Sequence, residues 1–190
     1  ETPKDLTQGR SETFTELQPK ASLAYSFREG VLGYVTVGKG FRAGGFNNLS
    51  EGSNFAPGFD QESLISYETG LKWSAYDGRL RSAMALFFTD YTDQQFFLFD
   101  QTGTQANINV PKSALWGGEL EVTALPTDSL QVDFAFGYTD SEIKEYEEVQ
   151  GVLVPAEAIL GSKVPGAPVW TVNLGLQHTA ALSDSTGLVS

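Results

Sequence analysis

The chain has 190 residues, of which 41% are hydrophobic and 12% aromatic, with 20 glycines and no cysteine. The absence of cysteine excludes a disulfide framework and thiolate metal sites. A formal net charge of −12 excludes a nucleic acid as partner, because phosphate binding needs a basic surface.

Apolar and polar residues alternate along the chain in segments longer than most soluble strands. Residues 20–27 alternate first, and 65–75, 130–139 and 170–177 follow in the same way. Each segment has one apolar face and one small or polar face, which predicts antiparallel strands. In Val31–Arg42 two sets of apolar residues compete, so the facing of this strand is unassigned.

The turn residues predict the strand register independently of the hydrophobic pattern. Asp77-Gly78 is a strong signal for a two-residue hairpin, and it pairs Trp73 with Ser82, Leu71 with Met84 and Tyr67 with Phe88. The apolar faces of the two strands then coincide.

A second hairpin is predicted around residues 126–128. The apolar rows of the two strands match only if the loop has an odd number of residues, which pairs Val122 with Val132 and Leu120 with Phe134. We therefore expect a turn of about three or five residues, or a bulge.

Tight turns and long loops alternate along the chain. The tight turns are Glu29-Gly30, Asp77-Gly78, 126–128 and 183–185, and the longer connections are roughly 44–62, 100–106 and 147–167. Short turns at one rim and long loops at the other are expected of an up-and-down outer-membrane barrel. The pattern predicts seven strands and the start of another at Gly187.

The apolar rows have two explanations, because they could face hydrocarbon or pack on a second sheet. Aromatic residues gather towards strand ends, as interfacial girdles require, and the assigned apolar rows carry no Lys or Arg. These observations favour lipid over a soluble β-sandwich.

Several stretches carry a family resemblance. They are YVTVGKGFRAGGFN at 34–47, YETGLKW at 67–73, DGRLR at 77–81, ALFFTDYTD at 85–93, GGELEVT at 117–123 and VPGAPVW at 164–170. In this order the chain resembles the barrel portion of TonB-dependent receptors.

The resemblance implies an all-β fold, an antiparallel up-and-down transmembrane β-barrel segment of seven or eight strands from a barrel of about 22 strands. Residues 1–190 would form part of this one barrel domain in the bacterial outer membrane, with outer-membrane lipid around it. The plug domain is expected to be absent from this chain, and the TonB complex to engage through the missing N-terminal region.

The function implied is that of a fragment of an active-transport receptor for a scarce nutrient. A ferric siderophore is the commonest ligand of the family, and vitamins or saccharides are others. A passive porin or adhesion barrel and a soluble β-sandwich binding module remain alternatives.

Ligand contacts are expected at the long-loop rim, from Arg42, Phe46, Asn47, Asn48, Phe96, Phe97, Phe99, Gln101 and Gln105. Aromatic rings and amides beside a cation suit an apolar, partly anionic small ligand. Phe96–Phe99 could instead be the outer aromatic girdle, and Arg42 could be a lumen ion-pair residue.

The residues expected to face the lumen and plug are Glu68, Lys72, Glu119, Glu121 and Asp133. The predicted register places Glu121 opposite Asp133, and like charges directly opposite are destabilising. Either a cation of the plug or of a neighbouring strand, such as Lys72, lies between them, or both carboxylates are solvated.

No motif of an enzyme is present: the chain lacks Gly-x-Ser-x-Gly, a phosphate-binding glycine loop before a helix and a histidine pair for zinc. We expect no enzymatic activity, cofactor or metal site.

Overall fold

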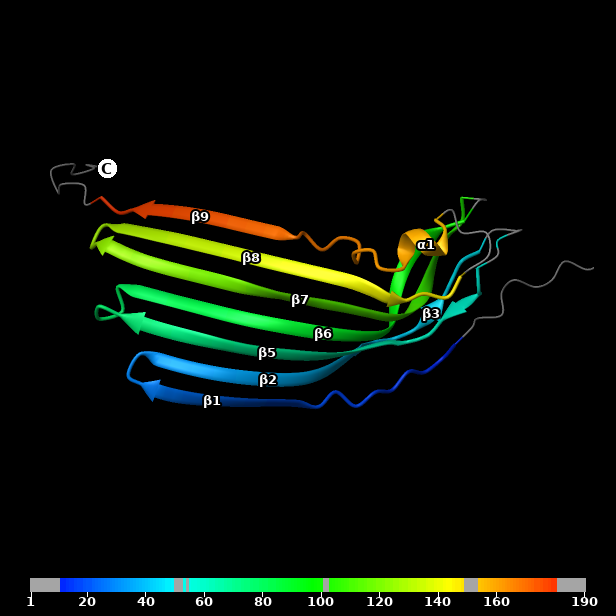
Figure 1. Cartoon of the computed structure of the whole chain (residues 1–190), viewed down its shortest axis with the longest axis horizontal. Helices are drawn as coiled ribbons and strands as arrows, with labels where there is room; N and C mark the ends of the chain where they lie inside the picture. The colour runs from blue at the N-terminus through cyan, green and yellow to red at the C-terminus, as the bar shows by residue number, and fades with distance from the viewer. Residues whose placement is uncertain (1–10, 50–52, 54, 101–102, 149–153, 181–190) are drawn as a thin grey trace, which may run out of the picture.

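The computed structural model describes residues 11–49, 53, 55–100, 103–148 and 154–180. Seven long strands form one antiparallel sheet in the order β1-β2-β5-β6-β7-β8-β9, each paired with the next long strand along the chain (Figure 1). Their bounds are β1 Lys20–Arg28, β2 Val31–Arg42, β5 Glu62–Ala75, β6 Leu80–Phe99, β7 Gln105–Thr127, β8 Leu130–Glu145 and β9 Trp170–His178. In the part of the chain that is described, no helix is long and apolar enough to cross a membrane.

The up-and-down order and the predicted count of seven strands are confirmed. All tight turns of the described chain lie at one end of the sheet and the long connections lie at the other (Figure 1). The long connections also hold a two-stranded ribbon, β3 Gly45–Phe46 with β4 Gly58–Phe59, and the short helix α1 Ala156–Ile159, which the sequence did not predict. The predicted turn at 183–185 and the strand at Gly187 lie outside the described residues.

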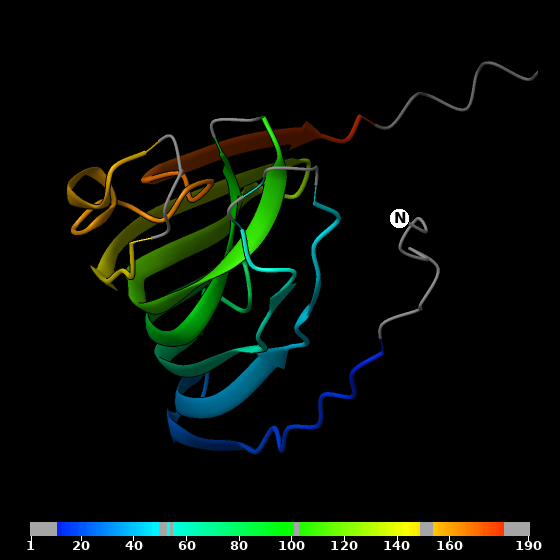
Figure 2. The ribbon, with the colours of Figure 1, turned by 90° about the vertical axis from the view of Figure 1, so that its right-hand side faces the viewer.

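The sheet is curved but not closed (Figure 2). Its two edges are β1 and β9, each paired on one side only. An open edge is not tolerated in lipid, so both edges need further strands to complete a barrel.

The hairpin between β5 and β6 keeps the predicted register, but its turn has four residues, 76–79, rather than two, and Tyr76 also has a positive φ of 53°. Asp77 and Gly78 have φ angles of 54° and 82°, and the Arg79 N–H donates to the Tyr76 carbonyl at 3.0 Å. Positive φ at both central residues matches the right-handed twist of the flanking strands. The predicted register is confirmed: Trp73 pairs with Ser82, Leu71 with Met84 and Tyr67 with Phe88.

The second hairpin contains the predicted bulge, but its predicted pairs are wrong by two residues. Val122 pairs with Phe134 rather than Val132, and Leu120 pairs with Phe136 rather than Phe134. The register shifts between Ala124 and Thr127, where β7 holds one residue more than β8. Pro126 lies in this bulge because proline has no N–H to donate to the ladder.

The register also settles the facing of β2. Val31, Val35 and Val37 pair with Trp73, Thr69 and Tyr67, so the odd residues of β2 belong to the apolar face. We call this side of the sheet the apolar face and the opposite side the polar face.

The apolar face is exposed across the sheet. Its exposed members include Leu23, Tyr25, Val35, Tyr67, Met84, Leu86, Phe88, Trp170, Val172, Leu174 and Leu176. Val172 and Leu174 are 68% and 67% exposed, and Phe134 and Phe136 are partly exposed, so no second sheet covers them in the described chain. This arrangement does not favour a sandwich core on this face and suits contact with hydrocarbon.

Two hydroxyl groups on the apolar face are satisfied within the sheet. Ser82 donates to the Glu121 carbonyl at 2.8 Å, and Thr69 donates to the Tyr34 carbonyl at 3.1 Å. Hydrocarbon offers no hydrogen-bond acceptor, so these contacts remove the cost of placing a hydroxyl there.

Candidate functional site: the polar face and the loop end

The polar face carries the ionisable residues that the sequence predicted for the lumen. Glu68 and Lys72 lie on β5, Glu119 and Glu121 on β7, and Asp133 on β8. Glu68, Lys72, Glu119 and Glu121 are exposed. The structure therefore leaves their charged groups open to whatever fills the space inside the sheet.

Tyr34 organises the charges on β5. Its hydroxyl donates to Glu68 at 2.7 Å, and the Lys72 ammonium lies 5.7 Å from the centre of its ring. The ring lies over Gly70, where a Cβ would come within 2.6 Å of the ring carbons. A larger residue at position 70 would push the Tyr34 ring out of this position.

The predicted like-charge pair on β7 and β8 is wrong. Glu121 pairs with Ala135, and Asp133 pairs with Thr123, because of the two-residue register difference described above. Asp133 accepts hydrogen bonds from Thr123 at 2.8 Å and Gln131 at 2.7 Å. Its charge is thus stabilised locally, and Lys72 lies over Tyr34 rather than between the two carboxylates.

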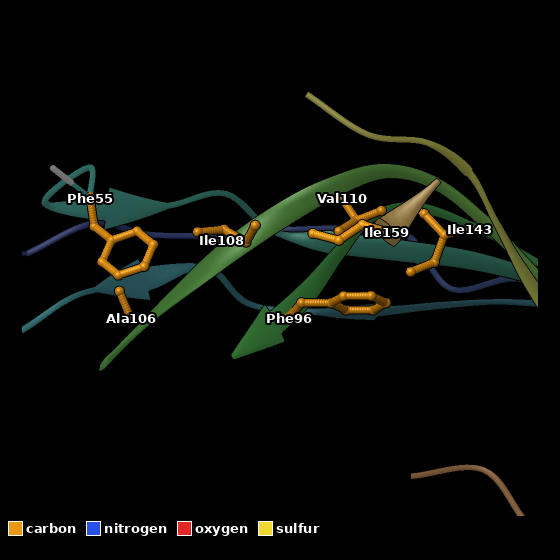
Figure 3. Packing of buried hydrophobic residues seen from close by; sticks show 7 residues of the cluster. All are labelled: Phe55, Phe96, Ala106, Ile108, Val110, Ile143 and Ile159. Atoms are coloured by element: carbon orange, nitrogen blue, oxygen red, sulfur yellow. The ribbon is translucent and has the colours of Figure 1, made fainter. Parts of the chain in front are cut away.

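The loop end is built around the parts of β6 and β7 that run past the apolar band, residues 93–99 and 105–111, which we call the β6–β7 extension. Its even-numbered residues Phe96, Ala106, Ile108 and Val110 are buried in one hydrophobic cluster. Phe55 from the 43–61 connection, Ile143 from β8 and Ile159 from α1 complete this cluster (Figure 3).

The odd-numbered residues of the β6–β7 extension carry amides that bind the 43–61 connection. Gln95 donates to the carbonyls of Ala43 and Asp60 at 2.8 and 3.1 Å. Asn109 accepts from the Asp60 N–H at 2.7 Å and donates to the Asp60 carbonyl at 2.9 Å. One face of the extension is therefore held by apolar packing and the other by hydrogen bonds.

Asn47 fixes the same connection to β7. Its side chain accepts from the Asn107 N–H at 2.9 Å and donates to the carbonyls of Asn107 at 2.9 Å and Ala56 at 3.0 Å. The amide thus pairs with main-chain groups as a neighbouring strand would. Its sequence neighbours Phe46 and Asn48 remain exposed.

The predicted ligand residues divide into two groups. Arg42, Phe46, Asn48, Phe97, Phe99 and Gln105 are exposed, whereas Asn47 is tied to β7 and Phe96 is 9% exposed in the cluster. Arg42 forms no ion pair with the described residues, and Phe97 and Phe99 meet edge to face at 5.7 Å. Gln101 lies outside the described residues.

Gln95, Asn107 and Asn109 are the structural residues that the sequence analysis missed. Their signal was present, since Asn107 and Asn109 alternate with apolar residues on the face opposite the cluster. Their partners in the 43–61 connection have no such pattern, so sequence alone could not pair the two segments.

The edge of β8 beyond β9 is covered by residues 160–169, which we call the edge segment. Val169 and Ser162 accept from the N–H groups of Thr139 and Ile143 at 3.0 and 2.9 Å. Between them, the Ser141 N–H donates to the Asp140 carboxylate at 2.8 Å. The described edge donors of this stretch are thereby paired without a strand beside them.

Asp140 also forms an ion pair with Lys163 of the edge segment. The neighbouring carboxylate raises the pKa of Lys163 above its usual range. The edge segment is thus fixed to β8 by main-chain hydrogen bonds and by this one charge pair.

Comparisons with known proteins agree with this geometry. The model of a family described as "TonB dependent receptor-like, beta-barrel" matches residues 2–187. The ferric-pyoverdine M114 receptor PbuA of Pseudomonas sp. (strain M114) is 28% identical over 130 residues, which are 68% of this chain and 15% of that protein.

Solved receptors share the fold. The ferric yersiniabactin uptake receptor FyuA from Yersinia pestis aligns with a TM-score of 0.64 at 21% identity, covering 84% of this chain and 22% of that one. The ferric-catecholate import receptor Fiu from K12 E. coli aligns with a TM-score of 0.61 at 25% identity, covering 85% and 22%. The chain spans a minor part of the length of each of these proteins.

Proposed function

We propose, since the chain belongs to the family of TonB-dependent receptor-like β-barrels, that it forms part of an active-transport receptor for a scarce nutrient. The chain lies in the bacterial outer membrane, and the family is one of transport receptors rather than enzymes. The family match over residues 2–187 is the observation that carries the proposal. The exposed apolar face on the seven-stranded sheet supports it.

The nutrient in this proposal is a ferric siderophore, the ligand class in the names of the similar receptors. The contacts come from the exposed loop-end residues Arg42, Phe46, Asn48, Phe97, Phe99 and Gln105, with Gln101 expected to join them. Arg42 supplies an unpaired cation for an anionic chelate, and the phenylalanines supply apolar surface. Asn47 and Phe96 hold this surface in place.

The polar face contacts the plug in this proposal, through Glu68, Lys72, Glu119, Glu121 and Asp133. The exposed carboxylates on β7 suit a basic segment of the plug. We expect Glu119→Gln with Glu121→Gln to weaken plug retention, measured as release of a separately expressed plug from the barrel. Glu142→Gln, on the opposite face, is the control and should leave retention unchanged.

Transport is tested by uptake of radiolabelled iron as ferric pyoverdine, ferric yersiniabactin and a ferric catecholate, in cells with and without the gene. Uptake of at least one chelate should require both the gene and TonB. Uptake that persists without TonB would support a passive porin instead.

The ligand surface is tested in the full-length receptor with the chelate that is taken up. We expect Arg42→Ala to weaken its binding about tenfold, or roughly 1.4 kcal/mol, because the charge pair with the anionic chelate is lost. Lys20→Ala removes a charge from the polar face without touching the loop end and should bind normally. If the two variants bind the chelate equally well, Arg42 is not part of the ligand surface. The proposal of active transport would be unaffected by that result.

A further inference from the structure

Residues 11–19, which we call the strap, lead into β1 from the loop end along the edge of the sheet (Figure 1). The Lys39 N–H donates to the Pro19 carbonyl at 2.9 Å, so the strap meets the sheet beside the end of β2. Phe14 and Glu16 are partly buried, whereas the other strap residues are exposed. These two side chains are therefore the ones that hold the strap to its neighbours.

Glu16 joins β2 to the end of the 43–61 connection. Its carboxylate forms an ion pair with Lys39 of β2, and its second oxygen accepts from the Gln61 amide at 3.0 Å. The side chains of Glu16 and Lys39 are 21% and 34% exposed, so water and salt screen this pair less than a fully exposed one. Both carboxylate oxygens thus have a partner, one on each element.

Phe14 lies against the start of the same connection. A Cβ at Gly44 would come within 2.7 Å of the tip of the Phe14 ring and 2.4 Å of the Phe59 carbonyl oxygen. Only a residue without a side chain allows residues 44 and 59 to approach this closely. The strap therefore contacts the connection near its first residue through Phe14 and at its last residue through Glu16.

The 43–61 connection is held on its other side by Asn47 and by the amides of the β6–β7 extension. It is thus fixed between two segments that are distant in the sequence. Its exposed residues Phe46 and Asn48 belong to the proposed ligand surface, and Arg42 directly precedes it. A shift at either end of the connection would move these side chains.

We propose that Glu16 is a positioning residue, which holds Arg42 and Phe46 in the arrangement that binds the ligand. The inference rests on the proposed function, but its first step, the fixing of the 43–61 connection, does not. A surface that is fixed before the ligand arrives loses less freedom on binding. The loss of Glu16 should therefore weaken binding without slowing the transport that follows it.

The test uses the full-length receptor with Glu16→Ala. Exchange of the Asn47 N–H, which donates to the Pro57 carbonyl at 3.0 Å, should speed up about fivefold. Uptake is measured with whichever of ferric pyoverdine, ferric yersiniabactin and a ferric catecholate the wild type takes up. The half-saturating concentration should rise about fivefold at an unchanged maximal rate.

Glu12→Ala is the matched control, because it removes the same charge from an exposed position of the strap. It should behave as the wild type does in both measurements. Glu16→Lys with Lys39→Glu restores opposite charges across the pair and should return both values towards those of the wild type. A general loss of stability would not be repaired by this exchange of charges.

Wild-type values in Glu16→Ala, an equal change in Glu12→Ala, or no recovery in the exchanged pair would overturn the proposal. A lower maximal rate at an unchanged half-saturating concentration would also overturn it. If the wild type takes up none of the chelates, the proposed function fails, and amide exchange alone decides whether Glu16 fixes the connection.

Discussion

Asn47 lies in a polar loop, yet its side chain is part of the fold. Asn47→Ala would leave the Asn107 N–H and carbonyl without their partner. We expect this change to lower the free energy of local opening around residue 107 by about 1–3 kcal/mol. Faster amide hydrogen exchange of Asn107 in the full-length receptor would measure it.

Asn48→Ala is the matched control for Asn47. Asn48 is exposed and makes no hydrogen bond with the described residues, so its loss should leave the exchange of Asn107 unchanged. Slow exchange in both variants would mean that the remaining contacts of the 43–61 connection protect Asn107 without the Asn47 side chain.

Arg79 and Asp128 join the neighbouring turns of two hairpins through a 2.6 Å ion pair. The guanidinium lowers the pKa of Asp128 below its usual range. A carboxyl group with a lowered folded-state pKa stabilises the fold above its unfolded pKa of about 3.9, and this contribution is lost as pH falls through the folded value.

We therefore expect Asp128→Asn to lower the melting temperature slightly and by a constant amount between about pH 5 and pH 8, since the pair is exposed. The two melting curves should converge in stronger acid. Asp77→Asn, which removes a carboxylate from the neighbouring turn but keeps the Arg79–Asp128 pair, is the control. A difference that grows as pH falls below 4 would contradict the role assigned to Arg79.

The two hairpins show how far local chemistry predicts an element. Asp77 and Gly78 both take the positive φ that their turn requires, so the register followed from the sequence alone. At Pro126 the turn and the bulge are separate features, and matching apolar rows could not say how many residues each takes. The predicted pairs were therefore wrong by two residues, although the prediction of an odd number of residues between the paired strands was right.

The edge segment offers a prediction at the scale of an element. Asp140→Asn keeps an oxygen that can accept the Ser141 N–H but loses the charge that binds Lys163. Asp140→Ala loses both contacts. We expect amide exchange at Ser141 to change little in Asp140→Asn and to speed up markedly in Asp140→Ala, by about tenfold for roughly 1.4 kcal/mol.

Lys163→Gln removes the ion pair with Asp140 without changing the Asp140 side chain that accepts the Ser141 N–H. It should release the edge segment from Asp140 while leaving the Ser141 N–H protected. Equal exchange at Ser141 in the two Asp140 variants would show that the carboxylate does not cap the edge of β8.

At the scale of the whole molecule, period-two alternation predicted the apolar face because several strands repeat it, and only the pairing with β5 assigned β2, whose own pattern is ambiguous. The loop end was less accessible to sequence analysis. Phe96 and Phe97 are identical in type and adjacent, yet one is 9% and the other 54% exposed. The difference arises partly from Ile143 and Ile159, which come from distant segments and pack in the cluster that holds Phe96.

A charged side chain is unfavourable on the apolar face and tolerated on the polar face. Two adjacent residues of β9 test this difference. Val172 pairs with Phe136 in the middle of the apolar band, and Asn173 pairs with Ala135 on the polar face. An arginine at the centre of the bilayer costs about 2–4 kcal/mol, so Val172→Arg should lower the unfolding free energy of the full-length receptor in lipid vesicles by that amount. Asn173→Arg should have a much smaller effect, because its side chain enters the polar interior. A larger loss for Asn173→Arg than for Val172→Arg would mean that the sheet faces lipid with its other side.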